Sequence, residues 1–131
     1  PIFGGMEKLL KELSESYSLI TISSTPTPLM SEYLQLHNLD QYFLKMMGSD
    51  VHKKKDVKVQ MVFDEYNVKN TDCLFITDTA GDMKEIAEHD LQIVAVTWGF
   101  HPRERLEKEN PYMIVDTVQE LFDAISKWSQ S

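Results

Sequence analysis

The sequence predicts an α/β fold, in which a Rossmann-like parallel sheet is covered by helices on both faces. Two observations support this prediction. Short runs that are apolar throughout alternate with amphipathic helical segments along the chain, and strands buried on both faces of a parallel sheet have this appearance. At 131 residues with 42% hydrophobic content, the chain is long enough to bury its own core, so we expect one domain over residues 1–131.

The first predicted elements are a helix, a strand and a second helix. Positions 6–14 carry apolar residues three or four apart, which is the spacing of one helix face. The run 19–22 is a short strand that stops at a cluster of turn-forming residues. The run 29–36 is a helix, with Thr27 as its cap and Pro28 at its first position.

The middle of the chain repeats the pattern of strand and helix. Residues 43–47 give a weaker strand signal and are followed by a helix at 57–66. An apolar strand at 74–77 then leads into a helix that continues over 83–88. The helix at 57–66 is expected to turn four side chains inward: Val57, Met61, Val62 and Tyr66.

The last elements continue the alternation to the end of the sequence. The run 93–97 is a fully apolar strand, 102–109 is helical, 113–115 is a final strand and 118–128 is an amphipathic helix. Apolar strands that alternate with helices of this length predict parallel strands joined by helical crossovers.

Composition excludes several classes of function. A net charge of −8 argues against a general nucleic-acid binder, which needs a basic surface. The single cysteine, Cys73, excludes an internal disulfide and is typical of a protein of the reducing cytoplasm. Because Cys73 begins an apolar strand, we expect it to be buried and unreactive. No apolar run approaches the roughly 20 residues of a membrane span, so we expect no membrane partner.

Two carboxylates stand where the strand at 74–77 gives way to a helix. Asp78 follows the strand directly, and Asp82 comes four residues later in the first helical turn. Ligand sites of open parallel sheets form at such strand ends, and two carboxylates without a nearby His or Cys suit Mg²⁺. The alternative is a helix N-terminus whose acidic residues favour the helix dipole.

Two further polar clusters fall at the same predicted edge of the sheet. Ser23 and Ser24 follow the strand at 19–22, where a hydroxyl and backbone N–H groups can bind phosphate; the alternative is a simple capping segment. Lys58 stands near the start of a helix, a position that the helix dipole makes unfavourable for a cation unless an anion is bound there. The preceding lysines at 53–55 are expected to form a solvated surface.

A hydroxyl, a lysine and a carboxylate pair at strand tips together suit the handling of a phosphoryl group. At these residues the chain resembles the haloacid dehalogenase (HAD) superfamily of phosphatases. Residues 19–23 resemble its second motif, Lys58 its third and residues 77–82 its fourth. Residues 1–10 resemble the segment that follows the family's cap, and residues 94–100 and 110–117 resemble its phosphoglycolate-phosphatase-like branch.

The resemblance implies a HAD-type core that hydrolyses a small phosphorylated metabolite with Mg²⁺. It implies that Ser23 and the amide of Ser24 hold the phosphoryl group, and that Lys58 stabilises its charge. Lys55 is the reserve candidate for the lysine, since the family's usual Lys-Pro pair is absent. The metal-binding residues implied are Asp78 as a direct ligand and Asp82 as a group that supports the metal indirectly or through water. Thr77 and Thr79 flank this site and offer hydroxyls to it.

The chain departs from the family pattern at the first motif. That motif is Asp-x-Asp at the end of the first core strand, it supplies the nucleophile, and it occurs nowhere in these 131 residues. Two interpretations remain open: a truncated part of a longer phosphatase, or a non-catalytic interaction or regulatory relative. A receiver-type signalling domain is less favoured, because its acidic residues come before its Thr and Lys, whereas here the order is Ser, Lys, Asp.

The missing strand also leads to a prediction about association. In the family it lies between the strands that correspond to 19–22 and 74–77. Without it each of these strands keeps an unpaired edge, and such edges seek a partner. The two strands pair with each other within one chain, or a second copy supplies the pairing. We expect the second outcome, a homodimer formed through exposed strand edges.

Overall fold

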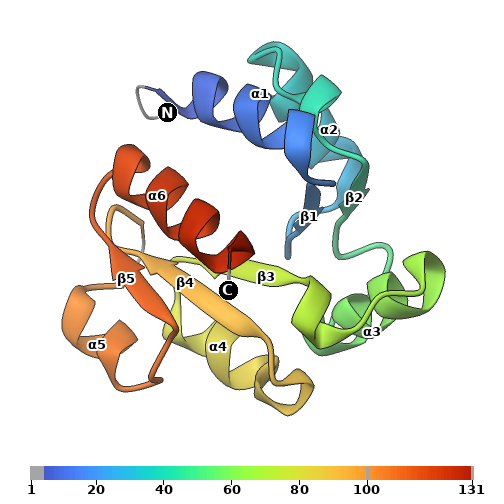
Figure 1. The fold of residues 1–131 in the computed structure, drawn as a ribbon. Helices are drawn as coiled ribbons and strands as arrows, with labels where there is room; N and C mark the ends of the chain where they lie inside the picture. Colours follow the sequence, from blue (N-terminus) through green and yellow to red (C-terminus); the bar gives the residue numbers. More distant parts are fainter. Residues whose placement is uncertain (1–4, 100, 131) are drawn as a thin grey trace. The chain divides into compact units, whose positions relative to one another are not determined.

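The structure, a computed structural model, describes residues 5–99 and 101–130 (Figure 1). The parts of the family resemblance that rest on Pro1–Gly4 and on Phe100 therefore lie outside the described residues. Helices and strands alternate as predicted, which confirms the α/β class. The elements are α1 (Met6–Ser16), β1 (Ile20–Ile22), α2 (Thr27–Leu36), β2 (Lys45–Met47), α3 (Lys55–Tyr66), β3 (Leu74–Thr77), α4 (Ala80–Glu85), β4 (Gln92–Val96), α5 (Arg103–Glu107), β5 (Met113–Val115) and α6 (Val118–Ser129), with 3-10 turns at Asp40–Tyr42, Asn70–Asp72 and Ala87–His89.

The chain forms two compact units, of which the first ends at Lys58 and the second begins at Val59. In the first unit, β1 pairs in parallel with β2, so that Ile20 lies opposite Lys45 and Ile22 opposite Met47. The predicted apolar face of α1 is confirmed by the burial of Leu9 and Leu13. The expected helix start, with Thr27 as cap and Pro28 as first helical residue, is wrong by one residue, since α2 begins at Thr27 directly after Pro26.

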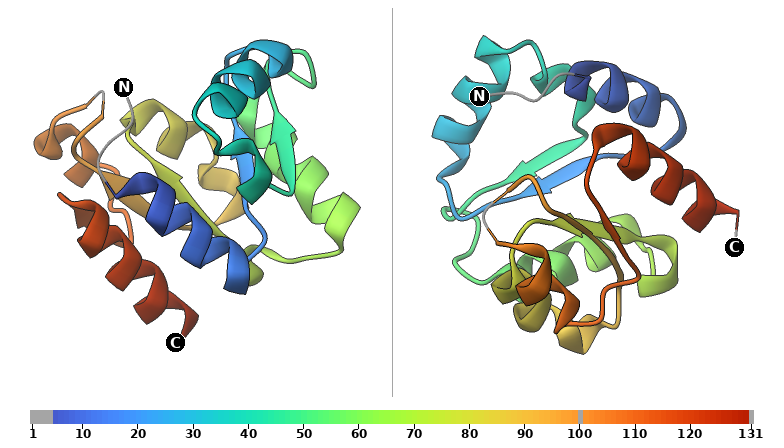
Figure 2. Two further views of the ribbon diagram at one scale, coloured as in Figure 1. Left: turned by 90° about the horizontal axis from the view of Figure 1, so that it is seen from above. Right: turned by 90° about the vertical axis from the view of Figure 1, so that its left-hand side faces the viewer.

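In the second unit, β3, β4 and β5 form a parallel sheet in that order. In the views of Figures 1 and 2, α4 and α5 lie on one face of this sheet and α6 lies on the other. Ala95 of β4 belongs to a buried cluster with residues of α4 and α5. Its neighbours Val94 and Val96 point to the opposite face, as successive strand residues do, and are also buried. This burial on both faces explains why β4 is apolar throughout.

Two burial predictions are corrected by the structure. Met61 of α3 was expected to face inward, but its exposed fraction is 38%, whereas that of Val59 is 3%. Apolar residues occur on several sides of this helix, so spacing alone does not single out one buried stripe. Cys73, expected to be buried, is only half-buried. Burial, and then the neighbouring charge of Asp72, raises the pKa of its thiol, which keeps it in the less reactive protonated form.

The connections that lead into β2, β3, β4 and β5 each contain a residue in the left-handed backbone region. After α2, Asn38 has a φ of 58°, and after α3, Asn67 has a φ of 53°. The residue after each one bonds back across the helix end, Leu39 N–H to the Leu34 carbonyl at 2.8 Å and Val68 N–H to the Phe63 carbonyl at 3.2 Å. This is the Schellman motif, which satisfies the last carbonyls of a helix. Asp90 and Asn110, which precede β4 and β5, also have positive φ.

Four strands keep an edge that no strand covers among the described residues: β1 and β2 in the first sheet, and β3 and β5 in the second. The predicted association concerns β1, whose partner is β2, and β3, whose partner is β4. On β3 the side chain of Ile76 is 42% exposed, which is unusual for a parallel strand, since such strands are normally covered on both faces. The strand edges that the predicted association requires are therefore present, while the association itself stays a prediction. Within residues 5–99 and 101–130, no helix has the length and apolar character needed to cross a bilayer.

Candidate functional site

The loop that follows β1 begins at Ser23, the predicted phosphate-binding residue. Its backbone N–H donates to the Met47 carbonyl at 3.0 Å and so continues the pairing of β1 with β2 by one residue. Its hydroxyl oxygen accepts from the Thr25 N–H at 3.0 Å, which folds the loop into a tight serine turn. Ser23 is half-buried and Ser24 is exposed. The loop therefore presents Ser24 to solvent from a backbone that hydrogen bonds hold in place.

The side chain of Lys58 reaches this loop from α3. Lys58 is fully buried, with an exposed fraction of 0%. Its ammonium donates to the Ser23 carbonyl at 2.8 Å and more weakly to the Gly48 carbonyl at 3.4 Å. Two residues that the sequence selected separately are thus in direct contact. Lys55, the reserve candidate, is the first residue of α3, and the choice of Lys58 as the lysine of the site stays a prediction.

The segment after β2 fixes the other end of the Ser23 loop. The N–H of Gly48 donates to the Thr27 hydroxyl at 2.9 Å, so Thr27 does not act as the helix cap that the sequence suggested. The N–H of Thr27 donates to Oδ1 of Asp50 at 2.5 Å. This hydrogen bond is the main cause that lowers the pKa of Asp50. A carboxylate distant in sequence therefore takes the place of a local cap at the start of α2.

The loop between β3 and α4 carries the two predicted metal ligands. Asp78 follows the end of β3, and Asp82 lies in the first turn of α4, both as predicted. The Thr77 hydroxyl donates to Oδ2 of Asp82 at 2.7 Å and accepts from the Thr79 N–H at 3.2 Å. The Thr79 hydroxyl caps α4 by accepting from the Asp82 N–H at 3.1 Å. Both flanking threonines thus orient Asp82.

The segment after β4 contacts the same loop. The backbone N–H of His101 donates to the Asp78 carbonyl at 3.2 Å, and its Nδ1 accepts from the Ala80 N–H at 2.8 Å. Gly99 lies against the Asp78 side chain, where a Cβ atom would overlap the carboxylate. Neither His101 nor Gly99 was predicted from the sequence. The sequence signal that points to them is a glycine followed two residues later by a side-chain acceptor, directly after an apolar strand.

The donor chemistry of this loop fits a hard divalent cation. Asp78 and Asp82 offer carboxylate oxygens, which Mg²⁺ prefers, and the absent side chain of Gly99 lets the Asp78 carboxylate pack closely against the backbone there. Within the described part of the chain, no group of three or more His, Cys, Asp or Glu residues could hold a metal ion. The two aspartates would therefore supply only part of a coordination shell.

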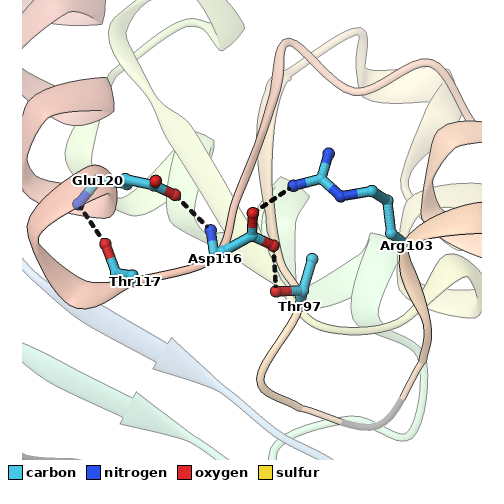
Figure 3. Close-up of polar contacts among 5 residues, drawn as sticks. All are labelled: Thr97, Arg103, Asp116, Thr117 and Glu120. Carbon is cyan, nitrogen blue, oxygen red and sulfur yellow. Dashed lines mark hydrogen bonds and ion pairs between the residues drawn. The ribbon is translucent and has the colours of Figure 1, made fainter.

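A second polar network joins the ends of β4 and β5 (Figure 3). The carboxylate of Asp116 accepts from the Thr97 hydroxyl at 2.6 Å and from the Arg103 guanidinium at 2.7 Å. The Thr97 bond, and then Arg103, lowers the pKa of Asp116. Glu120 accepts from the Asp116 N–H at 2.7 Å, and its own N–H donates to the Thr117 hydroxyl at 3.1 Å. These bonds cap α6 and tie it to the sheet, so we interpret the network as structural.

Comparison with known proteins identifies the family. A family model for the haloacid dehalogenase-like hydrolases matches residues 1–96, well over half of the chain. The chain belongs to the haloacid dehalogenase-like hydrolases. Related sequences include the phosphoglycolate phosphatase of Vibrio parahaemolyticus, 20% identical over 129 residues, a match that covers 95% of this chain and 57% of the relative. The phosphoglycolate phosphatase of Synechococcus elongatus is 27% identical over 128 residues, covering 96% and 60%.

Solved structures place this haloacid dehalogenase-like hydrolase in the same fold. A predicted phosphatase from Clostridium acetobutylicum matches with a TM-score of 0.87 at 28% identity, covering 95% of this chain and 60% of that one. A haloacid dehalogenase-like hydrolase from Streptococcus pneumoniae also has a TM-score of 0.87, at 24% identity, covering 94% and 59%. This chain thus spans 57 to 60% of the length of these relatives and holds part of the HAD-type fold.

Proposed function

We propose that this chain carries the phosphoryl-binding and metal-binding part of a Mg²⁺-dependent phosphatase that acts on a small phosphate monoester. The observation that carries the proposal is the contact between the buried ammonium of Lys58 and the carbonyl of Ser23 at 2.8 Å. A buried charge costs several kcal/mol even after relaxation. Such a group is therefore more expected at a functional site than in an ordinary core.

In this proposal the first unit binds the phosphoryl group. The hydroxyl of Ser23 and the N–H of Ser24 would bind its oxygens, and Lys58 would offset charge that accumulates there during transfer. The phosphoglycolate phosphatases among the relatives make a small phosphorylated acid the first substrate class to test.

The second unit would contribute the metal-binding residues. Asp78 would be a direct ligand of Mg²⁺, and Asp82, which the Thr77 hydroxyl orients, would bind through water. A cation bound there would supply positive charge of the kind that phosphoryl-transfer chemistry uses. Two carboxylates with water in the other positions form a weak site.

The nucleophile of the proposed reaction is not among these residues, because no Asp-x-Asp sequence occurs in the chain. Covalent transfer needs such a carboxylate. The alternative function is that of a non-catalytic interaction or regulatory relative. The coding sequence upstream of Pro1 distinguishes the two: an in-frame Asp-x-Asp-x-Thr favours the phosphatase, and a start codon directly before Pro1 favours the relative.

Binding of inorganic phosphate tests the phosphoryl site without requiring turnover. We would titrate phosphate into ¹⁵N-labelled protein with Mg²⁺ present and follow the amide signals by NMR. The expected result is a saturable shift at Ser23 and Ser24 that is lost in Lys58→Met and kept in Lys11→Met, an exposed lysine of α1. Shifts that are equal in both variants, or that occur at other loops, would contradict the proposed site.

A further inference from the structure

The segments that follow β2 and β4 share one arrangement. Each has a glycine and, two residues later, a side-chain hydrogen-bond acceptor: Gly48 with Asp50, and Gly99 with His101. Asp50 accepts from the N–H of Thr27, the first residue of α2, at 2.5 Å. His101 accepts from the N–H of Ala80, the first residue of α4, at 2.8 Å. In each unit an acceptor thus holds the start of the helix that follows a loop of the candidate site.

A second hydrogen bond in each unit reinforces the first. The N–H of Ser49 donates to the Thr25 carbonyl at 3.1 Å, and the N–H of His101 donates to the Asp78 carbonyl at 3.2 Å. Each segment therefore binds the neighbouring loop twice, through a backbone donor and through a side-chain acceptor. Two bonds of opposite direction fix both the position and the orientation of a loop.

The two glycines are required for space. Neither has a positive φ, since Gly5 is the glycine with that conformation among the described residues. A Cβ atom on Gly48 would overlap the Thr25 carbonyl oxygen and the Thr27 nitrogen. A Cβ atom on Gly99 would overlap the carboxylate of Asp78. The close approach that permits the hydrogen bonds thus depends on the missing side chains.

We propose that Asp50 and His101 are positioning residues, Asp50 for the phosphate-binding loop and His101 for the metal-binding loop. This inference rests on the proposed function. Asp50 and His101 act through backbone atoms and would hold Ser23 and Asp78 in place before a ligand arrives. Loops ordered in advance lose less conformational freedom on binding, which strengthens binding and aligns the groups.

The experiment uses paired variants of the whole chain. Asp50→Ala and His101→Ala remove each acceptor, whereas Asp50→Asn and His101→Asn keep an acceptor oxygen near the same position. The controls are Asp123→Ala on α6 and His37→Ala at the end of α2, both exposed. We would measure hydrogen exchange of the Thr27 and Ala80 amides without ligand, and then repeat titrations with inorganic phosphate and with Mg²⁺.

We expect exchange of the Thr27 amide to accelerate roughly tenfold in Asp50→Ala, and that of Ala80 by a similar factor in His101→Ala. Asp50→Ala should weaken the binding of phosphate, and His101→Ala should weaken the binding of Mg²⁺. The asparagine variants should restore most of the protection and the binding, and the controls should behave as the unchanged protein.

Two outcomes would overturn the inference: amide exchange that the alanine variants leave unchanged, or asparagine variants that behave as the alanine variants do. If exchange responds as expected but the unchanged protein binds neither phosphate nor Mg²⁺, the positioning role of Asp50 and His101 is supported and the proposed function fails. The exchange data and the titrations thus separate the two ideas.

Discussion

Lys58→Met removes a buried charge while keeping a side chain of similar length and volume, and its effect on stability can be worked from the structure. The hydrogen bond to the Ser23 carbonyl is 2.8 Å long, and a bond from a charged donor contributes about 1.5–3 kcal/mol. The contact with Gly48, at 3.4 Å, is too long to add much. The substitution also removes the desolvation cost of a fully buried ammonium, which is several kcal/mol and opposes the loss of the hydrogen bond.

The two effects nearly cancel, so we expect Lys58→Met to change the free energy of unfolding by no more than about 2 kcal/mol in either direction. Lys58→Ala also loses the outer methylene groups, at about 0.8 kcal/mol each, and leaves a cavity. It should therefore be roughly 2–3 kcal/mol less stable than the methionine variant.

Urea denaturation followed by tryptophan fluorescence measures both variants, and the phosphate titration measures function in parallel. The expected combination is near-normal stability with lost phosphate binding in Lys58→Met. A methionine variant as unstable as the alanine variant would show that Lys58 is a structural link between loops. Phosphate binding that survives in the methionine variant would refute its role in offsetting charge.

Four further outcomes are expected. With p-nitrophenyl phosphate and Mg²⁺ the chain should show no turnover, because the nucleophile is absent; activity that survives repurification and is abolished by Asp78→Ala would contradict this. Mg²⁺ should shift the amide signals of residues 77–83 with a dissociation constant of about a millimolar or weaker, and shifts only at other residues would place the metal elsewhere. The pKa of Asp116 is lowered in the folded protein. Its stabilising contribution is therefore complete above the ordinary carboxyl pKa of about 3.9 and is lost as the pH falls through the lower folded pKa. The difference in unfolding free energy from Asp116→Asn should be constant from about pH 5 to 7 and shrink below about pH 4. Sedimentation equilibrium should reveal a dimer formed through the free edges of β1 and β3, and a monomer from micromolar to millimolar concentration would exclude it.

The order of the elements could be predicted because it depends on local pattern. The apolar strands, the place of Asp78 after β3 and that of Asp82 in the first turn of α4 all follow from residues adjacent in sequence. The choice of Ser23 and Lys58 came from their positions next to a strand end and a helix start. Their contact could not be predicted from position alone, because it joins residues 35 apart in the sequence.

The remaining errors have a common cause in long-range contacts. The start of α2 was misplaced because Asp50, 23 residues away, supplies the acceptor that a local cap would otherwise provide. His101 was missed for the same reason, since it binds Ala80 across 21 residues. Met61 was assigned to the core because several faces of α3 are apolar, and tertiary packing decides which of them is covered.

The left-handed residues that end the helices divide the loops of this chain into two classes. Loops that lead from helix to strand, such as those at Asn38 and Asn67, are closed by bonds within their own few residues. The backbone bonds that end these helices therefore stay with the loop when it is exchanged, and one side-chain bond, from Asn70 to the Asp90 carbonyl at 3.1 Å, joins the Asn67 loop to the next loop of this kind. The Ser23 and Asp78 loops depend on segments that follow a neighbouring strand, so a graft from a relative has to carry both segments of a pair. Recombination that treats these loops as single modules would separate each one from the residues that shape it.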